Sequence, residues 1–298
     1  MAEARDIENY KTNKNSMAKT IKIFLIDGEP NGLKTAELSN WVGQAIVIPR
    51  NKLKDIKQRP ECNKPAVYFL VGKENEEALL PTAYIGEAEN LWNRLSTHDS
   101  SKDFWQTAVA FVSKDNNLTK AHVRYLESRC LSLATQAKRF DLENGTESSL
   151  PSLSEADIAE MEEFLENLKL LLSALGYPIL QEVISKEQKN ISDPLFTCKG
   201  KEALATGRMT NDGFVVYKDS TATADISKAV IERNQKVIEK LLANKYLEKR
   251  NDDLYVFVKD YVFNSPSAAS DIVLGNSTSG WKKWKTENGK TLEEIYRK

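Results

Sequence analysis

The sequence predicts an α+β protein with two domains. Short β-branched and aromatic runs, such as Ala66–Leu70 and 106–113, are typical of strands, and a long amphipathic run from Thr119 to about Phe140 is typical of a helix. These runs follow one another without an internal repeat, and the 298 residues are enough for two modest domains. We therefore expect two separate cores, each built from both helices and strands.

The composition argues against a protein that binds nucleic acid through its overall charge, a disulfide-rich protein and a zinc protein. Hydrophobic residues make up 41% of the chain and charged residues 29%, with a formal net charge of −1, so any nucleic-acid site must be a local patch. The three cysteines, Cys62, Cys130 and Cys198, are widely spaced and form no CxxC pair. This pattern argues against both a disulfide framework and a zinc site, and it indicates a reducing compartment.

The first 63 residues predict a leader and a small β/α flank. Residues 1–19 are polar, and we expect them to be a disordered leader. Within 20–63 the pattern predicts a strand that ends at a Gly-rich turn, then a short helix at about 33–42 and a second strand. The apolar run 21–26 is far too short to cross a bilayer, so we expect a cytoplasmic protein without membrane association.

Residues 64–145 predict the element order β-β-α-β-α, and the rest of the chain predicts a connector and a second domain. Residues 146–195 combine a linker with a helix that starts at Ser154 and ends at Gly176. Within 196–298 we expect a strand, a helix and a hairpin, at about 213–218, 228–247 and 252–263.

One carboxylate on the predicted helix after Thr119 faces inward. At about 100° per residue, Glu127 falls at the edge of an apolar stripe. The stripe consists of Val123, Leu126, Cys130, Leu133, Ala134 and Ala137. A buried carboxylate needs a cation, which could be a metal ion or, equally, Arg94 or Arg124 in a salt bridge.

Four further polar residues indicate a catalytic site only when they are considered together. Tyr68 or Tyr84 alone would be a packing residue of a strand, Arg94 a solvated helix residue and His98 an exposed loop residue. Two phenols on adjacent strands, a guanidinium and an inward carboxylate are, however, the groups needed to hydrolyse a phosphodiester with one hard metal ion.

The same residues resemble the GIY-YIG nuclease family over about 64–145. Ala66-Val67-Tyr68 precedes Tyr84-Ile85-Gly86, and both are followed by Arg94, Glu127 and then Asn144 in the order of the family motifs. The resemblance implies a three-stranded antiparallel sheet flanked by helices. Ala66 replaces the first glycine of the motif, and Glu87 follows the second motif, where an acid would repel phosphate unless it faces away.

The resemblance also implies a role for each site residue. Tyr68 would be the general base, Tyr84 would position the attacking water, and Arg94 would bind the scissile phosphate. His98 would assist at the phosphate or relay a proton. Glu127 would hold Mg²⁺ or Mn²⁺, and Asn144 matches an asparagine near the site.

The C-terminal part resembles the domain of unknown function DUF4357, with Asp219 where a glycine is more usual. Basic and aromatic residues alternate in Trp281, Lys282, Lys283, Trp284 and Lys285, as in a surface that stacks bases and holds phosphates. The alternative, which we favour for the two tryptophans, is that they pack in a small core.

The sequence thus predicts a metal-dependent endonuclease that acts on nucleic acid, with DNA as the expected substrate. The alternative hypothesis is a non-catalytic nucleic-acid-binding or regulatory protein that keeps the GIY-YIG fold. The sequence does not distinguish restriction, repair and defence.

Overall fold

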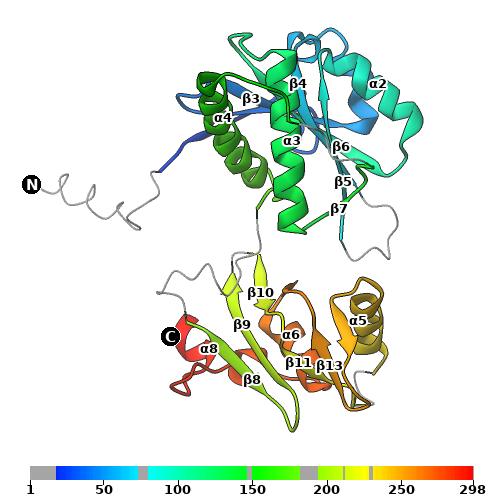
Figure 1. The fold of residues 1–298 in the computed structure, drawn as a ribbon, viewed down its shortest axis with the longest axis vertical. Coiled ribbons are helices and arrows are strands. Elements are labelled where there is room, and N and C mark those ends of the chain that lie inside the picture. Colours follow the sequence, from blue (N-terminus) through cyan, green and yellow to red (C-terminus); the bar gives the residue numbers. More distant parts are fainter. Residues whose placement is uncertain are drawn as a thin grey trace, which may run out of the picture. The chain divides into compact units, whose positions relative to one another are not determined.

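The computed structural model describes residues 18–72, 80–145, 150–181, 194–210, 212–227 and 231–297, and it confirms the α+β class (Figure 1). The chain divides between residues 181 and 182 into two compact units, which are described separately. Most of the expected leader, 1–17, lies outside the described residues. In the described ranges, no helix has both the length and the apolar character needed to cross a membrane.

The N-terminal unit is built on one seven-stranded sheet with the order β1-β2-β3-β6-β4-β5-β7. Neighbouring strands are antiparallel, apart from the parallel pair β5 and β7 at one edge. The strands are β1 (Ile21–Leu25), β2 (Lys34–Leu38), β3 (Gly43–Pro49), β4 (Ala66–Gly72), β5 (Thr82–Ala88), β6 (Trp105–Ser113) and β7 (Asp141–Leu142).

The order β-β-α-β-α predicted for 64–145 is confirmed by β4, β5, α2 (Leu91–Ser101), β6 and α3 (Lys120–Ala137). Asn90 caps α2 by accepting a hydrogen bond from the backbone N–H of Asn93 at 3.0 Å. Thr119 caps α3 in the same way, and Lys138 ends that helix in the left-handed region at φ 52°.

The helix expected at 33–42 is wrong, because the segment forms β2 and the turn into β3. β2 pairs with both β1 and β3, and β3 pairs with β6 along its whole length, Gly43–Pro49. Pairing on both sides satisfies the backbone of β2 and overrides its weak local preference for a helix. The flank is therefore a continuation of the same sheet.

The helix predicted from Ser154 is α4 (Glu155–Ala174), and the Ser154 hydroxyl accepts a hydrogen bond from the Asp157 N–H at 3.1 Å. We expected a connecting element. α4 instead packs on the sheet, where Phe164 and Leu168 join the same hydrophobic core as α3. Its apolar stripe needs this cover, because a leucine-rich helix face is not stable in water.

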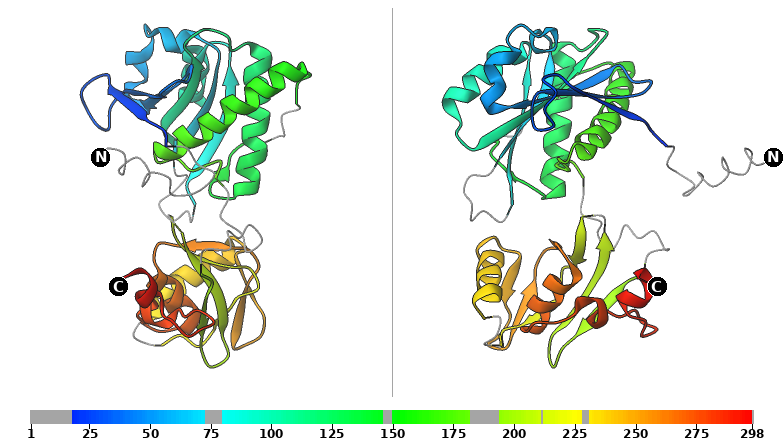
Figure 2. Two further views of the ribbon diagram at one scale, coloured as in Figure 1. Left: turned by 90° about the vertical axis from the view of Figure 1, so that its left-hand side faces the viewer. Right: turned by 180° about the vertical axis from the view of Figure 1, so that it is seen from behind.

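Two cores lie on the two faces of the sheet. α3 and α4 cover one face, and α2 with the 3₁₀ helix η1 (Arg50–Ile56) covers the other (Figure 2). Val67 and Phe69 point to the α3 side, whereas Tyr68 and Leu70 point to the α2 side, as alternation along β4 requires. A second 3₁₀ helix, η2 (Pro60–Asn63), leads into β4.

The C-terminal unit contains a four-stranded sheet, β14-β10-β9-β8, and a three-stranded sheet, β11-β13-β12. Its strands are β8 (Phe196–Lys199), β9 (Leu204–Thr210), β10 (Gly213–Val216), β11 (Thr221–Thr223), β12 (Leu247–Lys249), β13 (Leu254–Phe257) and β14 (Tyr261–Phe263). Its helices are α5 (Ile231–Ala243), α6 (Pro266–Leu274), α7 (Gly280–Lys283) and α8 (Leu292–Tyr296).

The strand predicted at 213–218 is confirmed by β10. The helix predicted at 228–247 is confirmed by α5 over 231–243, but Leu247 begins β12, and residues 228–230 lie outside the described ranges. The hairpin at 252–263 is wrong. β13 pairs with β11 and β12, whereas β14 pairs with β10 in the other sheet. The chain changes sheet at Asp260, whose carboxylate accepts a hydrogen bond from the Lys218 N–H at 2.7 Å. Asp219 has φ 67°, the left-handed conformation that makes a glycine common at this position.

Candidate active site

Tyr68 and Tyr84 lie side by side on the α2 face of the sheet. Tyr68 pairs with Gly86 across β4 and β5, and Leu70 pairs with Tyr84, so both phenols lie on the same face. Their ring centroids are 6.2 Å apart. The Tyr68 side chain is completely buried and Tyr84 is half-buried, which makes Tyr84 the more accessible phenol.

α2 brings Arg94 and His98 to the Tyr68 hydroxyl. The two residues are four apart and so lie on one side of the helix, above the sheet. Arg94 Nε donates to Tyr68 Oη at 3.2 Å, and His98 Nε2 lies 2.7 Å from the same oxygen. His98 is 4% exposed, so the exposed loop position expected of a lone histidine is wrong. We call Tyr68, Tyr84, Arg94 and His98 the phenol cluster.

The electrostatics of the phenol cluster favour neutral side chains at Tyr68 and His98. Burial raises the pKa of Tyr68, the neighbouring Tyr84 raises it further, and Arg94 opposes the rise. Burial also lowers the pKa of His98 to about 4, and the positive charges of Arg94 and Lys102 add to this effect. His98 is therefore a neutral imidazole at pH 7, and its buried Nδ1 has no hydrogen-bond partner among the described residues.

Lys102 belongs to the same site, although the sequence analysis did not identify it. Its Nζ lies 4.6 Å from the Tyr84 ring centroid and 2.5 Å from a carboxylate oxygen of Glu143. Lys102 follows α2 directly and Glu143 follows β7, so the ion pair joins two segments that are 41 residues apart. The spacing Arg94, His98, Lys102, four residues each, was the sequence signal that could have revealed it.

Asn144 binds the backbone of β5. Its Oδ1 accepts a hydrogen bond from the Ile85 N–H at 3.1 Å, and its Nδ2 donates to the Ile85 carbonyl at 2.7 Å. The amide thus continues the β5–β7 pairing, which among the named strands ends at Ala83. Asn144 thus stabilises β5, the strand that carries the Tyr84-Ile85-Gly86 motif, and it keeps one N–H and one oxygen lone pair beyond these two bonds.

Glu127 lies on the side of α3 that faces the outer edge of β5. Lys120 is two helical turns before Glu127, so the two residues lie on nearly the same side of the helix. Lys120 forms an ion pair with Glu89, which directly follows β5. The other side of α3 faces α4, because Arg129 Nε donates to Glu162 at 2.6 Å. Glu127 is half-buried, as expected at the edge of the apolar stripe.

The direction of α3 relative to β5 follows from the segments at its two ends. The helix begins near the end of β5 and its chain returns to β7, where Asp141 pairs with Thr82 at the start of β5, so α3 runs antiparallel to this strand. Glu127 is carried by the helix on one face of the sheet, whereas the phenol cluster lies on the opposite face.

The two departures from the motif pattern have a structural explanation. Glu87 pairs with Val67 and therefore points to the α3 face, away from Tyr84 and Gly86. Its negative charge acts on Lys120 there. Ala66 is fully buried in β4 within the core on the α2 face, where a methyl group is accommodated.

A hydrated divalent cation is compatible with the donor set of this region. The described residues contain no group of three or more His, Cys, Asp and Glu side chains that could hold a metal ion. Mg²⁺, however, commonly keeps several waters and binds through one or two carboxylates together with substrate phosphates. Glu127, a half-buried residue, offers one carboxylate of the kind that such a site uses, and the chemistry of Mn²⁺ is similar.

The residues proposed to bind nucleic acid in the C-terminal unit divide into two kinds. Trp284 is fully buried, and its Nε1 donates to the Pro266 carbonyl at 2.9 Å, so it is a core residue, in agreement with the alternative that we favoured. Trp281 is half-buried, with the Arg297 guanidinium 3.6 Å from its ring centroid. The remaining three residues are exposed: Lys282, Lys283 and Lys285.

Comparison with known proteins identifies the C-terminal unit. Residues 196–296 match a domain of unknown function, DUF4357. This unit is a DUF4357 domain. The DUF4357 domain thus coincides with the described part of the second compact unit. The chain matches no curated protein and no solved structure, so the GIY-YIG resemblance of the N-terminal unit stays a prediction.

Proposed function

We propose that the N-terminal unit is a metal-dependent endonuclease of the GIY-YIG type and that the DUF4357 domain helps to hold its nucleic-acid substrate, expected to be DNA. The observation that carries the proposal is the Tyr68 hydroxyl, which bonds to both Arg94 and His98 beside Tyr84. Two groups of α2, Arg94 and His98, converge on the phenolic oxygen of β4, and Tyr84 of β5 lies beside it, although packing alone would not require any of them to be polar.

Arg94 is suited to bind a phosphate. Its Nε is held by Tyr68, and the residue as a whole is exposed, so the guanidinium reaches solvent. Arginine binds phosphate oxygens through parallel N–H bonds, which fixes the orientation of the substrate as well as its charge. Lys102 adds a second positive charge beside Tyr84 on the same side of the sheet.

Tyr68 and His98 form a route for a proton. When His98 carries its hydrogen on Nδ1, Nε2 accepts a hydrogen bond from the Tyr68 hydroxyl at 2.7 Å. The raised pKa of Tyr68 means that the phenol is protonated before substrate binds, and it must lose this proton before it can act as a base. Glu127 belongs to the helix on the other face of the sheet, so a cation that it holds would have to reach the phosphate past the edge of β5 in order to neutralise charge there and on the leaving oxygen.

One observation favours a second function. The Tyr68 ring is completely buried, and its two hydrogen bonds attach α2 to the sheet. A hydroxyl used in this way also serves a protein that binds nucleic acid without cutting it. The alternative is therefore a non-catalytic nucleic-acid-binding or regulatory protein that keeps the same architecture.

A cleavage assay with a matched variant tests the proposal. The full chain is incubated with supercoiled plasmid and with a panel of single- and double-stranded DNA and RNA, in Mg²⁺, Mn²⁺ or EDTA. Glu127→Gln removes the metal-binding charge and keeps the size of the side chain. Glu163→Gln, an exposed position on α4, is the control for loss of one surface carboxylate.

We expect metal-dependent cleavage by the wild type and by Glu163→Gln, and none by Glu127→Gln at an unchanged melting temperature. Cleavage that persists in Glu127→Gln would refute the assigned metal ligand. Binding of a substrate without cleavage under every metal condition would instead support the non-catalytic alternative.

A further inference from the structure

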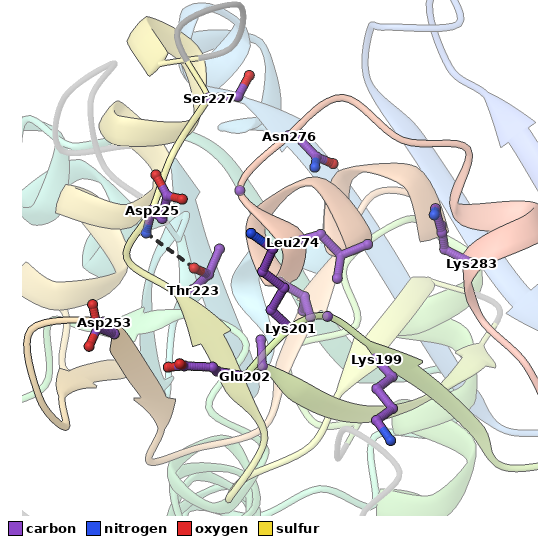
Figure 3. Close-up of a pocket in the computed structure, with 14 residues that line it drawn as sticks. Lys199, Lys201, Glu202, Thr223, Asp225, Ser227, Asp253, Leu274, Asn276 and Lys283 are labelled. Atoms are coloured by element: carbon purple, nitrogen blue, oxygen red, sulfur yellow. Dashed lines mark hydrogen bonds between the residues drawn. The ribbon is translucent and has the colours of Figure 1, made fainter.

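The DUF4357 domain contains a polar cavity of ≈ 450 Å³ between the turn from β8 to β9 and the C-terminal end of α6. Charged side chains of both signs line it, and Lys201 lies near its centre in Figure 3. Lys199 and Lys283 lie on one side of Leu274, and the carboxylates of Asp225 and Asp253 lie on the other (Figure 3). A cavity with separated charges is suited to a ligand that has an anionic end and a hydrogen-bond-donating end.

Lys199 and Lys283 are both close in the chain to an antiparallel bridge between β8 and the segment after α7. Thr197 in the edge strand β8 forms an antiparallel bridge with Lys285, with N–H···O distances of 2.7 and 3.0 Å. Lys199 is two residues after Thr197 and Lys283 is two residues before Lys285, so both lie toward the same end of this pairing. The buried Cys198 and Trp284 point the other way, into the core.

Within the described ranges, Lys199, Lys201 and Lys283 form no ion pair, although carboxylates line the same cavity. A bound anion would supply a countercharge to these lysines. The arrangement therefore favours an anionic ligand group at the lysine side.

The cavity walls are fixed before any ligand binds. Gly275 ends α6 with φ 68°, and a Cβ there would lie 2.1 Å from the Asp225 carbonyl oxygen. The Ser227 N–H donates to the Gly275 carbonyl at 2.8 Å, and the Gly200 N–H donates to the Ala203 carbonyl at 2.8 Å. Preformed walls reduce the entropy lost when a small ligand binds.

We infer that this cavity binds one nucleotide unit. The phosphate would contact Lys199 and Lys283, and hydroxyl or amino groups of the nucleoside would donate to Asp225 and Asp253. The volume is in the range of small-molecule sites. The inference rests on the proposal that the DUF4357 domain binds nucleic acid, but it does not require that the N-terminal unit cleaves it.

Binding is measured by titration calorimetry on the full chain in EDTA, which separates this test from any cleavage. The probes are a deoxynucleoside 5′-monophosphate, the deoxynucleoside alone and inorganic phosphate. The variants are Lys199→Gln/Lys283→Gln, Lys199→Arg/Lys283→Arg, which keeps the charges, and the control Lys236→Gln, an exposed lysine on α5.

We expect the monophosphate to bind more tightly than either part alone. The double glutamine variant should bind about tenfold or more weakly, the arginine variant should keep binding, and Lys236→Gln should match the wild type. Equal binding of phosphate and monophosphate, or no effect of the double glutamine variant, would overturn the inference. Oligonucleotides with a 5′-phosphate or a 5′-hydroxyl then identify the source: tighter binding of the phosphorylated strand indicates strand ends, and binding of the free monophosphate alone indicates a free nucleotide.

Discussion

The Tyr68 phenol lies directly over Gly86: a Cβ at Gly86 would be 2.4 Å from Tyr68 Oη and 2.6 Å from the ring carbon that carries it. The glycine of the Tyr84-Ile85-Gly86 motif thus makes room for the tyrosine of the neighbouring strand. Tyr68 keeps its bonds to Arg94 and His98 only as long as this space stays open.

Gly86→Ala should destabilise the N-terminal unit by about 1–3 kcal/mol, because the added methyl group displaces a fully buried ring. Gly145→Ala is the control, since nothing lies within 4 Å of a Cβ there. Urea unfolding of both variants measures the difference. Equal free energies of unfolding would contradict the close contact.

Tyr68→Phe keeps the ring but removes the oxygen that bonds to Arg94 and His98. We expect a loss of about 1–3 kcal/mol in the free energy of unfolding, because the buried His98 Nε2 is left without its partner. If the proposed general-base role is correct, cleavage should fall by about 10²–10⁴-fold in the same variant. An unchanged stability together with lost cleavage would assign the hydroxyl to chemistry alone.

Stability should fall as the pH is lowered through the range set by His98. Its folded pKa of about 4 is below the ordinary value of 6.5, so the unfolded state binds the proton more readily between these values. The contribution is fully present above pH 6.5 and is lost progressively toward pH 4, by roughly 2–3 kcal/mol in total. Urea unfolding at pH 4.5 to 7.5 checks this, and His98→Gln should show a shallower dependence on pH.

Lys102→Gln should raise the pKa of His98, because one of the two positive charges that lower it is removed. The chain has two histidines, so NMR titration of the imidazole signals can follow His98 with His122 as an internal reference. Removing Glu143 should act in the opposite direction, since its charge raises the pKa of His98. A His98 titration unchanged in Lys102→Gln would exclude Lys102 from the electrostatics of the phenol cluster.

The sequence predicted the individual helices and strands better than it predicted which strands pair with each other. The β-β-α-β-α order and the start of α4 followed from short-range patterns, namely alternation, periodicity and caps such as Ser154. The helix expected at 33–42 and the hairpin at 252–263 were wrong because strand pairing is decided by contacts far along the chain. β13 and β14 are three residues apart, yet they belong to different sheets.

The candidate site shows the same difference between local patterns, which the sequence revealed, and long-range contacts, which it did not. The motif spacing identified Tyr68, Tyr84, Arg94 and His98, because alternation along strands and a four-residue helical step are local rules. The burial of His98 was not predictable, since it depends on which helix covers which face of the sheet. The sequence analysis did not identify Lys102, because its ion pair joins it to Glu143, which is 41 residues away in the chain.

The pairing of β3 with β6 has a practical consequence for expression of the N-terminal unit. A fragment trimmed to the motif-bearing segment, residues 64–145, would lack β3 and so leave one side of β6 without backbone partners. This strand is nine residues long and mostly apolar. An unpaired edge strand of this kind pairs with other chains and causes aggregation. A soluble truncation should therefore begin before β1 and extend through α4, so that both the sheet edge and its helical cover are retained.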